Sequence, residues 1–304
     1  MNFDVIIIGG GAAGISAALW CAELKLNALL VEAKAELGGQ LLRVYNPIKN
    51  HLGIETANGR ELRDIFVGQI ENRQFAVRLQ SEITQIDLEK KSIWLESGEQ
   101  FSASAVIIAT GVRRRKLNVA GEEKFQRKGI IESGKHDASL VKSKNVCIIG
   151  GGDAAFENTL ILGETAASVT LVHRGKYFRA RAEFVEQANE NPKVEILTET
   201  VVQKITGNER VEAIELENLK TGEIFEKKVE AILLRIGVEP NTDFLKNQLE
   251  LDAVGYIKTN QNCETGAAGI YAVGDVANPV APTVSGAVGM GATAAKAIYA
   301  QLNS

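Results

Sequence analysis

The feature that most constrains the fold is a unit of strand, glycine loop and helix that occurs twice in this chain of 304 residues. In the first copy, the apolar run 5–8 leads into Gly9, Gly11 and Gly14, and helix-forming residues follow. In such a G-x-G-x-x-G loop, the first glycine permits the tight turn, the second admits a pyrophosphate, and the third lets the helix pack on the strand. The helix N-terminus also offers unpaired N–H groups to an anion.

An acidic residue indicates that this first loop does more than turn the chain. Glu32 directly follows the next predicted strand, 27–31, and lies 23 positions after Gly9. A carboxylate at this place accepts hydrogen bonds from a ribose of the nucleotide. The first copy therefore predicts a dinucleotide site.

The second copy differs from the first at the acidic position. Its loop positions, the first of them 141 residues after Gly9, are Gly150, Gly152 and Ala155. At the same offset of 23 stands His173, followed by Arg174. Loss of the acid removes the repulsion of a 2′-phosphate and an arginine can pair with one, so this site favours NADP over NAD. The alternative is that Arg174 is solvated at a strand end.

Two such units predict an α/β protein with two Rossmann-like domains, one for a flavin and one for a nicotinamide nucleotide. Two further apolar runs end in small or acidic residues of the expected flavin site: Ala109, Thr110, Gly111, Gly274 and Asp275. An aspartate there can accept a hydrogen bond from a ribityl hydroxyl. A small-residue helix from about 284 to 302 follows, and its N-terminus can stabilise negative charge on the flavin.

Composition excludes several other classes of protein. The formal net charge of -4 gives no positive field for nucleic acid. The three cysteines, Cys21, Cys147 and Cys263, are too far apart in sequence for a zinc knuckle or a disulfide framework, and no metal site is expected. No apolar run approaches the roughly 20 residues of a membrane span, and no secretory signal is evident, so we expect a cytoplasmic protein.

The chain resembles the low-molecular-weight thioredoxin reductases over essentially its whole length. The matching segments are Gly9–Gly14, Gly38–Leu41, Asn50–Gly53, Ala109–Gly111, Gly150–Asp153, His173–Arg174 with Phe178–Ala180, Gly237–Asn241 and Gly274–Asp275. The resemblance implies an NAD(P)H domain, 113–242, inserted into a split FAD domain, 1–112 and 243–304, in a homodimer. It adds Gly39, Gln40 and Asn50 to the FAD site and Arg179 to the NADPH or NADH site.

Departures from the family concern its reactive groups. The family places a C-x-x-C directly before an aspartate, where this chain has Ser133, Gly134, Lys135, His136 and Asp137. Because only a thiolate performs disulfide exchange, we expect no reduction of thioredoxin by the family mechanism. The family signature H-R-R also has Gly175 in place of its second arginine, which removes one contact to a phosphate.

The sequence therefore predicts an FAD-dependent oxidoreductase that takes hydride from NADPH or NADH and passes electrons to an acceptor other than an internal disulfide. His136 and Asp137 are candidate catalytic proton donors, or else a solvated remnant of the lost sequence. The run 113–116 could hold an acidic carrier such as ferredoxin, or be a solvated face. Two alternatives are a flavoenzyme reduced by ferredoxin or a second flavin, and a non-catalytic regulatory flavoprotein.

Overall fold

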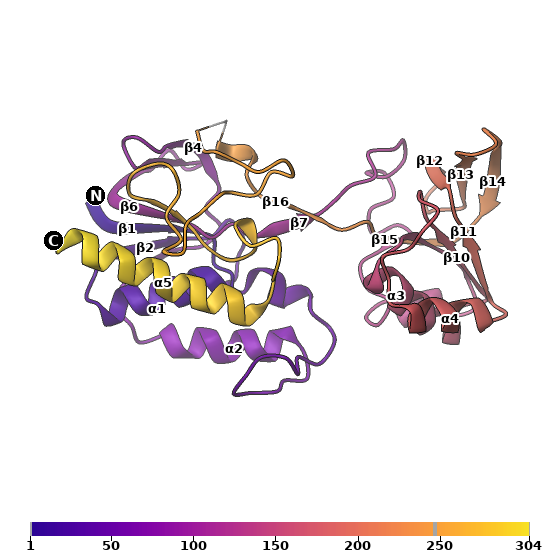
Figure 1. The fold of residues 1–304 in the computed structure, drawn as a ribbon, viewed down its shortest axis with the longest axis horizontal. Coiled ribbons are helices and arrows are strands. Elements are labelled where there is room, and N and C mark those ends of the chain that lie inside the picture. The colour runs from indigo at the N-terminus through magenta and orange to yellow at the C-terminus, as the bar shows by residue number, and fades with distance from the viewer. Residues whose placement is uncertain (1, 246–247, 304) are drawn as a thin grey trace. The chain divides into compact units, whose positions relative to one another are not determined.

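The computed structural model describes residues 2–245 and 248–303, which divide into two compact units (Figure 1). Unit 1 comprises 1–113 and 239–304, and unit 2 comprises 114–238. Unit 2 is therefore inserted into unit 1, and each unit has its own sheet and its own core.

The second boundary lies at 238/239, earlier than the predicted 242/243. Hydrogen bonds explain the difference. The backbone N–H of Asn241 donates to Gly111 O at 3.0 Å, and its side-chain Nδ2 donates to Thr110 O at 2.7 Å. Thr110 Oγ1 donates in return to Asn241 O at 2.8 Å. The returning segment is thus held by unit 1 before residue 243 is reached.

Unit 1 is built on a seven-stranded sheet of order β3-β2-β1-β6-β5-β4, with β17 paired to β6. Its strands are β1 (Asn2–Ile8), β2 (Ala28–Val31), β3 (Ala76–Arg78), β4 (Ile83–Asp87), β5 (Ser92–Leu95), β6 (Gln100–Ile108) and β17 (Ile270–Ala272). Strand β1 pairs in parallel with β2 and with β6, β2 pairs in parallel with β3, and β6 pairs in parallel with β17. The pairs β5–β6 and β4–β5 are antiparallel. The carboxyl ends of the parallel strands consequently share one edge.

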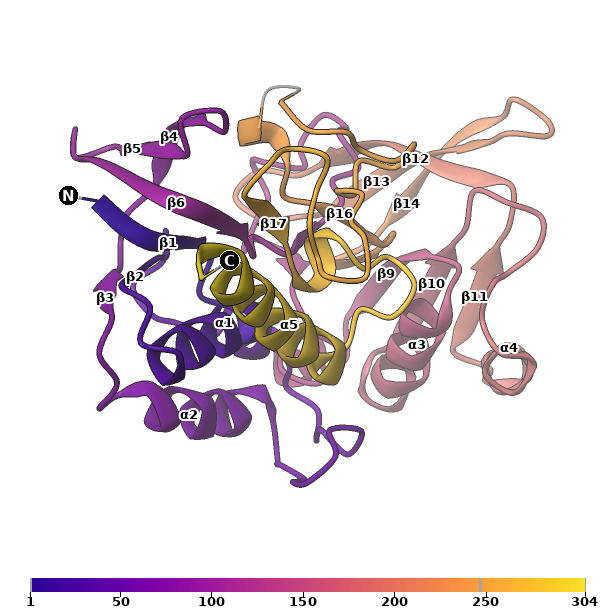
Figure 2. The same ribbon diagram turned by 60° about the vertical axis from the view of Figure 1, so that its left-hand side comes forward.

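Alternation along β1 places the two faces of this sheet in two separate cores. Val5 and Ile7 lie in one core, and Ile6 and Ile8 lie in the other. The helices of unit 1 are α1 (Ala12–Glu23), α2 (Gly59–Ile70) and α5 (Val284–Leu302). Figure 2 shows α1 and α5 side by side, and both pack on the face that carries Val5. The absence of a side chain at Gly291 permits this close approach, since a Cβ there would lie only 2.4 Å from Ala13 O.

Unit 2 contains a five-stranded parallel sheet of order β11-β10-β9-β15-β8 and a three-stranded antiparallel sheet of order β12-β13-β14. Its strands are β8 (Ile130–Ile131), β9 (Asn145–Gly150), β10 (Ser168–Val172), β11 (Val194–Leu197), β12 (Thr200–Thr206), β13 (Ala213–Asn218), β14 (Ile224–Lys228) and β15 (Ala231–Arg235). Helices α3 (Asp153–Thr165) and α4 (Ala182–Glu190) cover one face, and the antiparallel sheet covers the other.

Two short strands, β7 (Val112–Arg114) and β16 (Val238–Pro240), pair where the chain enters and leaves the insert. The predicted α/β class with two Rossmann-like units is confirmed. Within residues 2–245 and 248–303, no helix combines the length and apolar character needed to span a bilayer.

Candidate dinucleotide-binding sites

The first glycine loop joins β1 to α1 and needs glycine at two positions for reasons internal to the protein. Gly9 has a φ of +106°, and a Cβ there would lie 2.5 Å from Ala109 O. A Cβ at Gly14 would lie 1.9 Å from Gly9 O, so α1 could not pack on the loop. Both glycines are therefore required by the fold itself.

Gly11 is different because the protein leaves space beside it. The nearest heavy atom to a Cβ built on this residue is Gly39 Cα, at 3.9 Å. The fold does not require glycine here, whereas a pyrophosphate lying against the backbone would. The cradle at the N-terminus of α1 therefore fits a dinucleotide.

Glu32 is held against this loop at the carboxyl end of β2. Its Oε2 accepts from the Gly10 N–H at 2.7 Å, and its Oε1 accepts from the Lys34 N–H at 2.9 Å. The two bonds fix the orientation of the carboxylate, and each oxygen keeps a lone pair for a ribose hydroxyl.

Several segments predicted for the FAD site meet at the same edge of the sheet. Gly38 N donates to Gly10 O at 2.7 Å, which brings Gly39 and Gln40 beside the loop. Gln40 Nε2 donates to Val112 O at 2.6 Å, directly after Gly111. The structure thus brings together most of the predicted set, namely Gly9, Gly11, Gly14, Glu32, Gly39, Gln40, Ala109, Thr110, Gly111 and Gly274.

Asn50 is exposed, and within the described part of the chain no hydrogen bond or ion pair ties its side chain to this edge. Its neighbour His51 lies in a loop closed by an isolated bridge between Ile48 and Thr56. His51 Nδ1 is 3.0 Å from Ser285 Oγ, in the first turn of α5. Residues around Asn50 are therefore connected to the N-terminus of α5.

Asp275 follows β17 and is partly buried. Burial raises the pKa of its carboxyl above the usual value of 3.8. Among the described residues, none forms a hydrogen bond or ion pair with this side chain. A carboxylate that loses water without gaining a protein donor fits the role of acceptor for a ligand hydroxyl.

Thr283 is the N-cap of α5. Its Oγ1 accepts from the Gly286 N–H at 3.1 Å. The sequence reasoning assigned this residue no role, although a threonine directly before a long apolar helix is a signal for a cap.

The second glycine loop joins β9 to α3, and its positions also divide into those that the fold requires and one that faces open space. Gly150 has a φ of +155°, and a Cβ there would lie 2.3 Å from Arg235 O. Ala155 is fully buried and fills the third position. Around Gly152 there is nothing within 4 Å of an added Cβ, so this loop also leaves room for a ligand against its backbone.

His173 takes the place of the carboxylate in the second loop. A Cβ on Gly151 would lie 2.3 Å from its ring, so the imidazole packs directly on the loop backbone. Nε2 is 3.0 Å from Tyr177 O, and the ring is 5.2 Å from that of Phe178. His173 therefore lines the site in a fixed position and, unlike Glu32, brings no negative charge to it.

Arg174 and Arg179 follow β10 and are exposed. In residues 2–245 and 248–303, no carboxylate pairs with either guanidinium. The nearby Arg181 instead pairs with Asp153 at 3.1 Å and Glu183 at 3.0 Å. Arg179 is also tied to the loop, since its backbone N–H donates to Gly151 O at 2.8 Å. These two arginines can accept a phosphate without first breaking an ion pair.

The segment 132–137 is anchored by the buried carboxylate of Asp137. Its Oδ2 accepts from Glu132 N at 2.8 Å and from Ser133 N at 3.0 Å. Gly134 N donates to Asn158 Oδ1 on α3 at 2.9 Å. His136 Nε2 lies 3.8 Å from Asp137 Oδ1, and its side chain is 56% exposed. The two candidate catalytic residues thus differ, one holding the loop and one presented to solvent.

The basic run 113–116 is engaged by partners within the chain. Arg113 pairs with Glu239 at 2.7 Å and with Asp243 at 2.6 Å. Arg115 Nε donates to Val238 O at 3.0 Å, and Lys116 pairs with Glu123 at 3.1 Å. These contacts fasten the segments where the insert begins and ends.

All three cysteines are buried and reduced. Burial raises the pKa of Cys21 and Cys147 to about 12 and that of Cys263 to about 11. None is therefore a thiolate near neutral pH. Within the described residues, no group of three or more His, Cys, Asp or Glu side chains is arranged to hold a metal ion.

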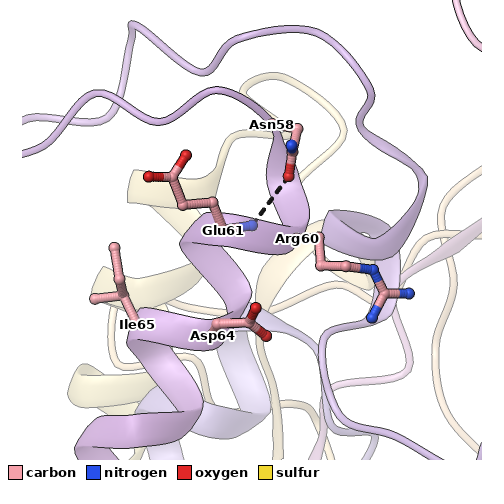
Figure 3. Close-up of a pocket in the computed structure, with 5 residues that line it drawn as sticks. All are labelled: Asn58, Arg60, Glu61, Asp64 and Ile65. Atoms are coloured by element: carbon pink, nitrogen blue, oxygen red, sulfur yellow. Dashed lines mark hydrogen bonds between the residues drawn. The ribbon is translucent and has the colours of Figure 1, made fainter.

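A surface hollow of about 530 Å³ lies at the N-terminal part of α2 (Figure 3). Asn58, Arg60, Glu61, Asp64 and Ile65 line it. Asn58 caps α2 by accepting from Glu61 N at 3.0 Å, and Arg60 pairs with Glu36 at 3.0 Å. None of the predicted site residues lines this hollow, so the hollow is not part of either dinucleotide site.

Comparisons with known proteins agree with this architecture. The profile of the family described as "Pyridine nucleotide-disulphide oxidoreductase" matches residues 3–291. The thioredoxin reductase of Treponema pallidum is 32% identical, covering 100% of this chain and 98% of its own. The "34.2 kDa protein in rubredoxin operon" of Clostridium pasteurianum is 31% identical, covering 97% and 95%. The crystal structure of Lactococcus lactis thioredoxin reductase in its FR conformation has a TM-score of 0.85 and 31% identity, covering 98% of both chains.

Proposed function

Because the chain belongs to the pyridine nucleotide-disulphide oxidoreductases, and within them to the low-molecular-weight thioredoxin reductases, we propose that it passes electrons from NAD(P)H through FAD to an acceptor other than an internal disulfide. The family relationship establishes an oxidoreductase that uses FAD and a nicotinamide nucleotide. The proposal concerns what receives the electrons.

The burial of all three thiols carries this proposal. Each is inside a core of unit 1 or unit 2, with a pKa raised to about 11 or 12. Segment 133–137 has no cysteine, and its aspartate accepts hydrogen bonds from two backbone N–H groups. Disulfide exchange needs an accessible thiolate, and the described residues supply none.

The residues of each unit would bind and orient the cofactors. Bound FAD would supply the redox chemistry, which is two-electron transfer as a hydride from a reduced nicotinamide. In unit 1, Gly11 admits the pyrophosphate, Glu32 accepts from the ribose, and Asp275 accepts from the ribityl chain. In unit 2, Gly152 admits the second pyrophosphate, while Arg174 and Arg179 pair with a 2′-phosphate.

We assign His136 the role of exchanging a proton with solvent or with the acceptor. Its imidazole is exposed, while the neighbouring carboxylate fixes the loop that carries it. An imidazole has one ring nitrogen that can donate a proton and one that can accept it, which is the chemistry that this exchange needs.

Anaerobic mixing of the purified yellow protein with NADPH and, separately, with NADH tests the proposal. We expect bleaching of the flavin absorbance, faster with NADPH. If neither nucleotide bleaches it while reduced ferredoxin does, the enzyme draws its electrons from a protein carrier. If no donor bleaches it, the regulatory flavoprotein is the better account.

A second measurement tests the acceptor. Ferricyanide, a benzoquinone, and thioredoxin disulfide are offered to the NADPH-reduced protein. We expect turnover with the first two, since they take electrons from flavin directly, and none with thioredoxin. Stoichiometric reduction of thioredoxin would contradict the proposal.

We also propose a homodimer, as is typical of the family, with light scattering on the holoprotein as its test. For a carrier such as ferredoxin, the run 113–116 is a poor docking surface because its side chains are engaged by Glu239, Asp243 and Glu123. The exposed Lys135, beside His136, is more accessible than this run. A substitution that removes its charge tests whether such a carrier docks there.

A further inference from the structure

Two guanidinium groups of unit 2 converge on one backbone carbonyl. Arg114 Nη1 donates to Glu132 O at 2.6 Å, and Arg235 Nη2 donates to the same oxygen at 3.0 Å. Arg235 ends β15 and is only partly exposed, and its Nη1 donates to Leu234 O at 2.9 Å. Across residues 2–245 and 248–303, no carboxylate forms an ion pair with Arg235.

The positive charge of Arg235 is poorly compensated. Burial and, next, the charge of Arg114 lower the pKa of Arg235 to about 10. Glu157 and Asp137 act in the opposite direction, but only from beyond ion-pair distance. Asp137 is already engaged by the backbone of its own loop. Like charges removed from water gain most from a bound anion.

The position of Arg235 indicates which anion. In the sheet register Arg235 is the partner of Gly150, the first glycine of the second loop. Strand β9 lies between β10 and β15, so the nucleotide crevice opens at the carboxyl ends of these strands. His173 and Arg174 follow β10 and belong to the adenosine side. The end of β15 is left for the other half of the nucleotide.

We propose that Arg235, with Arg114 beside it, binds the phosphate of the nicotinamide half of the nucleotide held by the second glycine loop. This inference rests on the proposed function, because it requires a nicotinamide nucleotide in unit 2. A separate phosphate compound has the same chemistry, and the experiment distinguishes the two sources.

The experiment is isothermal titration of the FAD-loaded protein with four probes: NADP⁺, NAD⁺, adenosine 2′,5′-bisphosphate and inorganic phosphate. The variant is Arg235→Met, which keeps an unbranched apolar stem and removes the charged guanidinium. Loss of a charge-assisted contact is expected to weaken NADP⁺ and NAD⁺ about tenfold or more. The bisphosphate, which lacks the nicotinamide half, is expected to bind within about twofold of wild type.

Arg174→Gln is the matched control, with the opposite pattern. It is expected to weaken NADP⁺ and the bisphosphate, which carry the 2′-phosphate, and to spare NAD⁺. Arg235→Lys is expected to recover part of the affinity for NADP⁺, because it restores the charge. Circular dichroism and the melting temperature check that each variant is folded.

Three outcomes would overturn the inference. Unchanged NADP⁺ affinity in Arg235→Met would refute the role of Arg235 in phosphate binding but would not contradict the proposed function. Loss of inorganic phosphate binding alone assigns the arginines to a separate phosphate compound. If the wild type binds neither NADP⁺ nor the bisphosphate, the proposed function fails together with it.

Discussion

The carboxylate oxygen Oε2 of Glu32 accepts a hydrogen bond from the backbone N–H of Gly10 at 2.7 Å. At the corresponding place in unit 2, the ring of His173 packs on Gly151. One loop is therefore lined by a fixed negative charge and the other by an imidazole. This difference suits a ribose with its free 2′-hydroxyl in unit 1 and a 2′-phosphate in unit 2.

Replacing the carboxylate tests its role in unit 1. Glu32→Gln keeps the shape of the side chain but removes the charge, so the contact to a ribose hydroxyl loses its charge assistance. We expect FAD affinity to fall about tenfold, measured by flavin fluorescence on titration of the apoprotein. Glu36→Gln is the control, since Glu36 pairs with Arg60 on the surface. An equal loss in both variants would refute a specific contact.

The middle glycines of the two loops separate folding from binding. A methyl at Gly11 or Gly152 meets no protein atom closer than 3.9 Å, so the variants Gly11→Ala and Gly152→Ala are expected to fold normally. Gly11→Ala is expected to lose FAD, and Gly152→Ala to keep FAD but lose NADP⁺ affinity, because each methyl fills the pyrophosphate's place. Bound flavin and titration calorimetry report the two effects.

Gly68→Ala is the control for these glycine variants. Gly68 is exposed on α2 with nothing within 4 Å of an added Cβ. Alanine is expected to stabilise that helix by roughly 0.5–1 kcal/mol without altering either nucleotide. If Gly152→Ala binds NADP⁺ as wild type does, the second loop is not its site.

Restoring the missing arginine is expected to tighten NADPH binding. A Cβ at Gly175 would lie 3.0 Å from His173 Nε2, so the ring needs to shift by only a few tenths of an ångström. Gly175→Arg adds a guanidinium beside Arg174, and a charge-assisted contact of about 1.5 kcal/mol corresponds to about tenfold in affinity. Calorimetry with NADP⁺ and NAD⁺ checks this prediction. A gain that is equal for both nucleotides would argue against a 2′-phosphate contact.

Asp275 is expected to oppose stability and favour binding. Since burial raises its folded-state pKa, the folded protein holds this proton more tightly than the unfolded chain, and stability falls as pH rises from about 4 through the raised pKa. Asp275→Asn removes that decline, so the variant apoprotein gains stability relative to wild type towards neutral pH, measured by urea unfolding across pH. Its FAD affinity is expected to drop. A difference in stability that does not vary with pH would contradict this account.

The anchor of segment 132–137 can be separated from its histidine. Asp137→Ala leaves two backbone N–H groups without their acceptor and is expected to cost about 1–3 kcal/mol of stability. His136→Gln, on an exposed side chain, is expected to change stability by less than about 0.5 kcal/mol. It should instead shift the pH profile of turnover if the imidazole carries a proton. Thermal melts and rates between pH 5 and pH 9 measure both.

Local patterns made the two glycine units and the last helix predictable. Glycines at fixed spacing between an apolar run and a helix specify a turn whose geometry depends on few distant residues. The predicted helix from about 284 to 302 corresponds to α5, Val284–Leu302, because its small residues form a continuous surface against α1. The family, the fold class and the use of FAD with a nicotinamide nucleotide are confirmed.

Contacts between distant parts of the chain were not predictable in the same way. Arg113 finds its partners at Glu239 and Asp243, more than a hundred residues away, and only the paired segments at the ends of the insert bring them together. Arg235 gave no signal at all, since a single arginine at the end of an apolar run is ordinary. Its significance comes from Arg114 and from the shared carbonyl of Glu132.

The pairing of β7 with β16 means that the insert begins and ends at points that are adjacent in space. Arg115 N donates to Gly237 O at 3.1 Å, so the two ends of unit 2 are already side by side. A domain with neighbouring termini can be exchanged as a cassette with little rearrangement of its host. With the nicotinamide nucleotide in unit 2, as proposed, recombination at these two short strands would exchange the coenzyme preference and leave unit 1 unchanged.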